Sequence, residues 1–158
     1  MSEEPRRQRD DCSEADRPIR QMLLVEDNLV DIMVTQEVLR ESRTPIRLNV
    51  VRDGCEAMEF LRREGKYTTA PRPHLILLDL NLPKKDGREL LAEIKKDSHL
   101  RSIPVIVVAT SLSGNDVVNS YNLHANCLIA KPLELDQYTA MLRSIEDFWF
   151  CVVRLPSD

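Results

Sequence analysis

The sequence predicts an α/β fold, a doubly wound parallel five-stranded sheet with helices on both faces. Two observations carry this prediction. Short apolar runs alternate five times with segments of helical character, and the run that ends at Asp79 is apolar at almost every position. A continuous apolar run this short, bounded by turn residues, is typical of a strand buried on both faces. Strands that alternate with helices form a parallel sheet covered on both sides.

The first half of the chain supplies three strands and the two helices between them. The strands are expected at residues 21–26, 46–51 and 74–79. The helices are expected at residues 29–42 and 55–64. Asp27 or Asn28 can cap the first helix, because both side chains accept hydrogen bonds from free amides at a helix start. Asp53-Gly54 turns the chain into the second helix.

The second half continues the same alternation. Its strands are expected at residues 105–109 and 126–130, the first of them introduced by Pro104. Its helices are expected at residues 88–97, 116–123 and 134–153. Asp86-Gly87 and the segment Ser113-Gly114-Asn115 break the chain before two of these helices. The five strand–helix pairs show no tandem sequence repeat.

Length and composition favour one domain with tails. The chain has 158 residues, and residues 1–20 are charged and aperiodic, which predicts a disordered N-terminal tail. The net charge of −4 argues against nucleic acid as the main partner. No apolar run reaches membrane-spanning length and no signal core is found, so a cytoplasmic protein without a membrane partner is expected. The four cysteines have no metal-binding or disulfide spacing.

Carboxylates close two of the apolar runs. Asp79 alone fits equally well a solvated turn residue that caps the next helix. However, Glu26-Asp27 closes the first run in the same way. Parallel strands that end in acids at one edge would bring three carboxylates together, at a repulsion of several kcal/mol. A hard divalent cation relieves that repulsion, and oxygen ligands favour Mg²⁺ over zinc or copper.

Lys131-Pro132 follows a further apolar strand and adds a cation to the same edge. An ammonium there suits a phosphoryl oxygen as a point charge. A surface lysine at a strand end is common, so this feature is weak alone. The acid pair, the strand-end Asp79 and the strand-end Lys131 together are far more specific than any one of them.

Three segments together resemble the receiver domain of two-component response regulators. They are Leu24-Val25-Glu26-Asp27-Asn28, the run from Leu77 to Gly87, and Lys131-Pro132. The resemblance covers about residues 20–145. Three further segments are similar to the single-domain response regulators of bacterial phytochrome histidine kinases, namely Phe60 to Gly65, Leu123 to Cys127, and Ser144 to Trp149.

The resemblance implies a flavodoxin-like (βα)₅ fold with strand order 2-1-3-4-5, and a receiver domain at residues 21–145. It implies that Asp79 accepts a phosphoryl group from a sensor histidine kinase of the bacteriophytochrome type. Glu26, Asp27, Asp79 and the backbone carbonyl of Asn81 would hold Mg²⁺, and Lys131 would contact the phosphoryl oxygens. Such a protein is a phosphoacceptor that promotes only its own phosphorylation and dephosphorylation, and no effector domain is expected after the fifth helix.

The chain departs from the family at its switch positions. Receivers usually place Thr or Ser where this chain has Ala109, and an aromatic residue where it has Leu128. Thr110 follows directly, but neighbouring strand residues point to opposite faces. In one interpretation phosphorylation occurs but couples weakly to output. In the other, Thr110 reaches the site after a shift of the loop. We favour the first.

The last helix is unusually apolar. Its inward stripe is predicted to contain Leu135, Tyr138, Leu142, Ile145, Trp149 and Val152. Residues 146–158 form an extension whose apolar side chains exceed what one layer can bury. They include Phe148, Trp149, Phe150 and Val153. A loosely packed tail is one interpretation. A homodimer interface is the favoured one, because aromatic clusters are enriched at interfaces.

Two other function classes compete with the phosphoacceptor. A phosphorylation-independent scaffold would explain Ala109 and Leu128, but not the intact acids and Lys131. A phosphatase with an aspartyl intermediate would need a second acid for proton transfer where the chain has Asn81. Asn81 and Ser111 are expected to tune the lifetime of the phosphoryl group.

Overall fold

The computed structural model describes residues 18–110 and 114–156. Its centre is one parallel sheet of five strands in the order β2-β1-β3-β4-β5. The strands are β1 (Arg20–Val25), β2 (Ile46–Val51), β3 (Leu75–Asp79), β4 (Val105–Ala109) and β5 (Cys127–Ala130). The predicted fold class and strand order are therefore confirmed. Arg20, placed in the predicted tail, belongs to β1, while residues 1–17 of that tail lie outside the described part of the chain.

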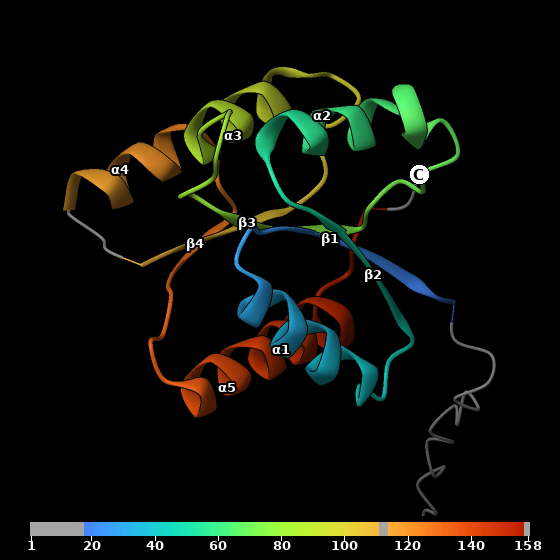
Figure 1. Cartoon of the computed structure of the whole chain (residues 1–158), viewed down its shortest axis with the longest axis vertical. Coiled ribbons are helices and arrows are strands. Elements are labelled where there is room, and N and C mark those ends of the chain that lie inside the picture. Colours follow the sequence, from blue (N-terminus) through green and yellow to red (C-terminus); the bar gives the residue numbers. More distant parts are fainter. Residues whose placement is uncertain (1–17, 111–113, 157–158) are drawn as a thin grey trace, which may run out of the picture.

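Helices cover both faces of the sheet. They are α1 (Leu29–Arg40), α2 (Gly54–Arg62), α3 (Gly87–Lys96), α4 (Gly114–Asn122) and α5 (Leu135–Glu146). Figure 1 shows α2, α3 and α4 on one face and α1 and α5 on the other. A short 3₁₀ turn, η2 (Gly65–Tyr67), follows α2, and a π-helix, η3 (Asp147–Val152), extends α5. None of the helices in the described ranges is long and apolar enough to cross a membrane.

The sheet separates two apolar cores, because side chains alternate along each strand. Leu23 and Leu78 pack on the side of α2 and α3. Leu24 and Leu77 pack on the side of α1 and α5. All five residues of β3 are buried, as are all five of β4. This double burial confirms the interpretation of the two apolar runs and holds the ends of β3 and β4 rigidly.

Caps fix where the helices begin. Asn28, rather than Asp27, caps α1: its side chain accepts hydrogen bonds from the amides of Val30 and Asp31. Asp53 caps α2 in the same way. The Asp27 side chain is thus left free for the edge of the sheet.

The C-terminal helix differs from its prediction. The stripe drawn with a regular α-helical period places Leu135 and Val152 inward, but these side chains are 59% and 73% exposed. Leu135 is the first residue of α5, and the buried positions of this helix begin only at Tyr138. Val152 points outward because the chain changes to π-type hydrogen bonding, in which the Val153 amide donates to the Phe148 carbonyl at 2.8 Å. The wider turn rotates later side chains off the stripe.

Candidate functional site

Three carboxylates meet at the C-terminal edge of the sheet. Strands β1 and β3 are parallel neighbours with Val25 opposite Leu78, so the residues that follow, Glu26 and Asp79, lie side by side. One oxygen from each of Glu26, Asp27 and Asp79 lies within 4.8 Å of the other two. The predicted convergence of the strand-end acids is what the structure shows.

Lys131 brings its ammonium to this cluster from the end of β5. Its Nζ lies 2.9 Å from Glu26 Oε2 and 3.3 Å from Asp79 Oδ2. The Lys131 amide donates to the Ala109 carbonyl at 2.8 Å, which fixes the backbone beside the end of β4. The side chains of Lys131, Glu26 and Asp79 are each at most 8% exposed. These ion pairs are therefore shielded from water and salt.

Backbone amides orient the two buried carboxylates. The Asn81 amide donates to Asp79 Oδ1 at 2.9 Å, and the Asn28 amide donates to Glu26 Oε1 at 3.0 Å. Each carboxylate thus has one oxygen held by an amide and the other turned toward Lys131. This pattern holds the Asp79 carboxylate in place at the sheet edge.

The start of α3 lies against the end of β3. A Cβ atom on Gly87 would be 2.6 Å from Leu80 Cα and 2.7 Å from the Asp79 carbonyl oxygen. Real Cβ atoms do not approach backbone this closely, so only glycine fits here. Gly87 thus lets the start of α3 pack against the end of β3, where its amide donates to the Leu80 carbonyl at 3.1 Å.

Burial and the neighbouring charges shift the pKa values of two groups in the cluster. Burial raises the pKa of Glu26 to about 7: it outweighs the hydrogen bond from Lys131, and the charge of Asp79 adds to the rise. Burial by itself lowers the pKa of Lys131, but the hydrogen bonds to Asp31 and Glu26 outweigh it, so this pKa lies above its usual value. The ammonium therefore stays charged, and its single positive charge faces the three carboxylates of Glu26, Asp31 and Asp79.

The donor set suits a hard divalent cation. Glu26, Asp27 and Asp79 offer only oxygen, the ligand type that Mg²⁺ prefers. A cation here would relieve the repulsion between Glu26 and Asp79, which adds to the effect of burial on the pKa of Glu26. The residues present therefore fit a bound Mg²⁺.

Sequence reasoning missed Asp31. This residue lies in the first turn of α1, and its Oδ2 is 2.7 Å from Lys131 Nζ, the shortest of the three carboxylate contacts of the ammonium. The available signal was its position one helical turn after Asp27, which places it above the same sheet edge. From the sequence alone, Asp31 is explained as an acid that stabilises a helix N-terminus.

The three switch positions lie on the other side of the cluster. Ala109 is buried at the end of β4 within the core of the α2–α3 side, and Leu128 is partly buried against that core. Thr110 is exposed, and its hydroxyl accepts a hydrogen bond from Asn81 Nδ2 at 3.1 Å. Thr110 thus contacts a neighbour of Asp79. Ser111 lies outside the described residues.

The proposed interface residues of the C-terminal segment divide into two sets. Trp149 and Phe150 are partly buried and pack against the core of the α1–α5 side. Phe148 is 53% exposed and meets Trp149 edge to face, with ring centroids 5.6 Å apart. Val153 is partly buried. The outer surface of the segment is therefore carried by Phe148 together with Val152.

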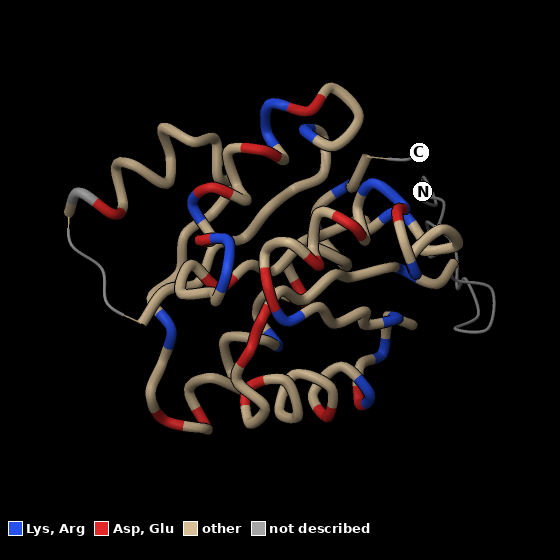
Figure 2. Tube along the Cα trace, turned by 45° about the horizontal axis from the view of Figure 1, so that its top comes forward, with Lys and Arg blue, Asp and Glu red and all other residues tan. Residues whose placement is uncertain are grey.

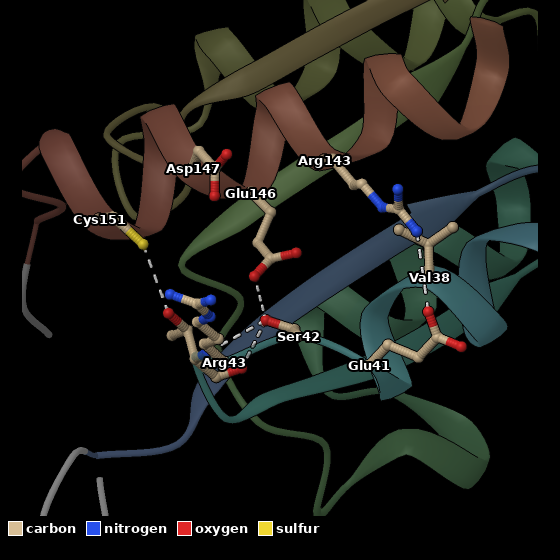
Figure 3. Close-up of a pocket in the computed structure, with 9 residues that line it drawn as sticks. Val38, Glu41, Ser42, Arg43, Arg143, Glu146, Asp147 and Cys151 are labelled. Atoms are coloured by element: carbon tan, nitrogen blue, oxygen red, sulfur yellow. Dashed lines mark hydrogen bonds and ion pairs between the residues drawn. The ribbon is translucent and has the colours of Figure 1, made fainter. Parts of the chain in front are cut away.

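A pocket of about 770 Å³ lies where this segment meets the α1–β2 loop, and its lining does not include Glu26, Asp27 or Asp79. Figure 3 shows Glu146 pointing to Ser42, whose hydroxyl donates to it. The Thr44 hydroxyl and the Cys151 thiol lie 3.5 Å apart. Arg143 forms an exposed ion pair with Glu41 at 3.8 Å. These contacts fasten the C-terminal segment to the body of the domain, and the pocket belongs to that junction.

Charge elsewhere is mixed. Figure 2 shows Lys and Arg positions scattered among Asp and Glu positions along the described chain.

The sheet order, the edge carboxylates and the strand-end lysine define one class of protein. The family model of the response regulator receiver domain matches residues 22–143, and the chain belongs to this family.

Individual relatives show which kind of receiver-domain protein the chain resembles in sequence and structure. Response regulator Rcp1 of Synechocystis is 49% identical over 145 residues, which cover 92% of this chain and 99% of that protein. The crystal structure of the phosphorylated cyanobacterial phytochrome response regulator RcpA is 52% identical, with a TM-score of 0.86, and covers 89% of this chain and all of that one. The Mn²⁺-bound form of Rcp1 is 50% identical, with a TM-score of 0.84, and covers 87% of this chain and 99% of that one. The predicted likeness to phytochrome response regulators is confirmed.

Proposed function

We propose that the chain receives a phosphoryl group on Asp79 from a sensor histidine kinase and signals through protein contacts. The observation that carries the proposal is the convergence of Lys131, Glu26 and Asp27 on Asp79. A phosphoryl group in transfer carries spread negative charge, so positioning and charge neutralisation provide most of the catalysis. The site offers both. Its turnover is limited to its own phosphorylation and dephosphorylation.

The chemical step needs little besides the residues at this edge. An oxygen of the Asp79 carboxylate attacks phosphorus, the bond from phosphorus to the donor breaks, and the donor leaves with the electron pair. The Asn81 amide holds the Asp79 oxygen that faces it, and Lys131 neutralises charge on the transferred group. Mg²⁺ held by Glu26, Asp27, Asp79 and the Asn81 carbonyl would supply further positive charge.

Exposed apolar side chains beside the site suit a protein donor. Leu29, Val30 and Met33 at the start of α1 are between 58% and 66% exposed. Leu133, 91% exposed, and Leu135 follow Lys131. The Lys131–Asp31 ion pair joins these two segments, so the side chains share one rim. Apolar patches of this kind mark protein contact surfaces.

The relatives indicate the kind of kinase. RcpA is a phytochrome response regulator, and another solved relative, 36% identical, is a bacteriophytochrome response regulator. We therefore propose a bacteriophytochrome-type histidine kinase as the partner. A cytoplasmic location follows from this partner, because the phosphoryl group derives from cytoplasmic ATP.

The decisive experiment is incubation with Mg²⁺ and acetyl phosphate. The parent should gain one acid-stable, base-labile phosphate on Asp79, visible by mass spectrometry. Asp79→Asn should remain unlabelled, and removal of Mg²⁺ with a chelator should abolish labelling. Labelling of Asp79→Asn as readily as the parent would refute the proposal.

Homodimerisation through the C-terminal segment is part of the proposal. Truncation after Ile145 would also remove Trp149 and Phe150 from the core, so Phe148→Glu is the cleaner variant. Its matched control is Val118→Glu, because Val118 on α4 is similarly exposed at 57%. Light scattering should show a dimer for the parent and the control, and a monomer for Phe148→Glu. A Phe148→Glu protein that stays dimeric would contradict a dimer interface at the C-terminal segment.

A second candidate, a scaffold that works without phosphorylation, is favoured by Ala109 and Leu128, which offer no hydroxyl or aromatic switch. The acetyl phosphate experiment separates the two candidates. An unlabelled parent supports the scaffold.

A further inference from the structure

We propose that Asp31 is a positioning residue that holds the Lys131 ammonium back from the acceptor until a phosphoryl group arrives. The proposal rests on the proposed function and assigns a role to a residue outside the predicted site. Lys131 Nζ contacts Asp31 at 2.7 Å, Glu26 at 2.9 Å and Asp79 at 3.3 Å. An ammonium has three hydrogens, so all of its donors are engaged, and the acceptor Asp79 has the longest contact.

Local structure holds Asp31 in this position. Asn28 caps α1 by accepting from the Asp31 amide at 3.1 Å. The hydroxyl of the fully buried Thr35 donates to the Asp31 carbonyl at 2.7 Å. The helix N-terminus stabilises the negative charge of the side chain. Asp31 is thus a fixed anion on one side of Lys131.

Asp31 differs in role from the other acids. The three carboxylates that lie within 4.8 Å of one another are Glu26, Asp27 and Asp79. The contact of Asp31 is with Lys131. Its side chain is 22% exposed, whereas that of Lys131 is 8% exposed. It therefore affects the reaction through the ammonium.

Phosphorylation changes what Lys131 can bind. An acyl phosphate adds nearly two negative charges and three acceptor oxygens at Asp79. To contact them, the ammonium must weaken one of its present ion pairs. Asp31 competes for Lys131 at the shortest distance, so it opposes the phosphorylated state. Removing its charge lets the ammonium shift toward Asp79 and favours phosphoryl transfer.

The test compares labelling rates with acetyl phosphate at saturating Mg²⁺. In this reaction an Asp79 oxygen bonds to phosphorus and acetate leaves with the electrons of the broken bond. Asp31→Asn should be labelled three- to tenfold faster than the parent. Asp136→Asn is the matched control, because Asp136 is an exposed acid in the first turn of α5. Its rate should equal that of the parent.

A double-mutant cycle shows whether Asp31 acts through Lys131. In a Lys131→Ala background, Asp31→Asn should give no increase in rate, and an increase there would overturn the proposal. Calorimetry should show that Asp31→Asn weakens Mg²⁺ binding less than Asp27→Asn does. Equal weakening would make Asp31 a metal ligand and would also overturn it.

The outcomes separate the two proposals. A parent that is not labelled on Asp79 overturns the proposed function and, with it, the role of Asp31. A labelled parent whose Asp31→Asn form is equally fast or slower overturns the role of Asp31 alone.

Discussion

The two sides of the acceptor site connect to the rest of the molecule in different ways. On the α1–α5 side, Lys131 binds Asp31, the Thr35 hydroxyl binds the Asp31 carbonyl, and the Tyr138 hydroxyl lies 3.4 Å from that of Thr35. Thr35 and Tyr138 are buried. On the β4–α4 side, Ala109 offers no polar side-chain atom, and Thr110 contacts Asn81 through an exposed hydrogen bond.

This difference indicates which helices respond structurally to a change at Asp79. A modification shifts a conformational equilibrium only through contacts that differ between the two states. Buried polar contacts carry more of such a difference than exposed ones, because water does not replace them. We therefore expect α1 and α5, rather than α4, to respond most to phosphorylation.

The largest effect should come from packing on the α1–α5 side. Leu142 on α5 is 1% exposed, so Leu142→Ala should lower the free energy of unfolding by about 3 kcal/mol through lost burial and a cavity. Val118→Ala on α4 is the counterpart, because Val118 is 57% exposed. It should change stability by less than about 0.5 kcal/mol. Urea unfolding measures both, and equal losses would contradict the contrast.

A smaller effect should come from the polar contacts of Thr35. Thr35→Val keeps the shape but removes the hydroxyl that donates to the Asp31 carbonyl, which should cost about 1 to 2 kcal/mol of unfolding free energy. Ser144→Ala is a matched control: Ser144 makes the same kind of bond, to the Ala140 carbonyl at 3.0 Å, but is exposed. The control should be within about 0.5 kcal/mol of the parent. If Thr35→Val were equally mild, the buried contacts would lose their special role.

Sequence patterns predicted the sheet and its acid edge because both follow from local rules. Apolar runs fix the strands, and parallel pairing brings residues after β1 and β3 together whatever the loops do. The ion pair of Asp31 was not predicted, because its partner Lys131 is 100 positions away in the sequence. The packing of α1 beside α5 brings the two residues together. A helix-start acid has an ordinary local explanation that hides such a contact.

The C-terminal segment shows the opposite failure. Its apolar residues were recognised, but their faces were derived from a regular α-helical period. The π-type hydrogen bonding of η3 leaves the neighbours Trp149 and Phe150 both packed on the core and turns Val152 outward. A count of apolar positions does not reveal a change of helix type, because it assumes the regular α-helical period throughout.

The smallest and most informative effect should come from adding the missing hydroxyl. Ala109 is buried at the end of β4, beside the backbone that positions Lys131. In Ala109→Thr a hydroxyl there can donate to the phosphoryl group, and one such bond is worth about 1 kcal/mol, or roughly a fivefold change in an equilibrium. Hydrogen exchange in α4 should then respond to phosphorylation several-fold more strongly than in the parent.

The control for this variant is Thr110→Val, which removes the exposed hydroxyl that Asn81 contacts. The response of α4 should stay as weak as in the parent, because Thr110 points away from the acceptor in the favoured interpretation. If the parent already shows a response in α4 and Thr110→Val abolishes it, the Thr110 hydroxyl replaces the hydroxyl that Ala109 lacks. Both sides of the site would then be coupled to phosphorylation. If Ala109→Thr leaves the response unchanged, the weak coupling has another origin than the lost hydroxyl.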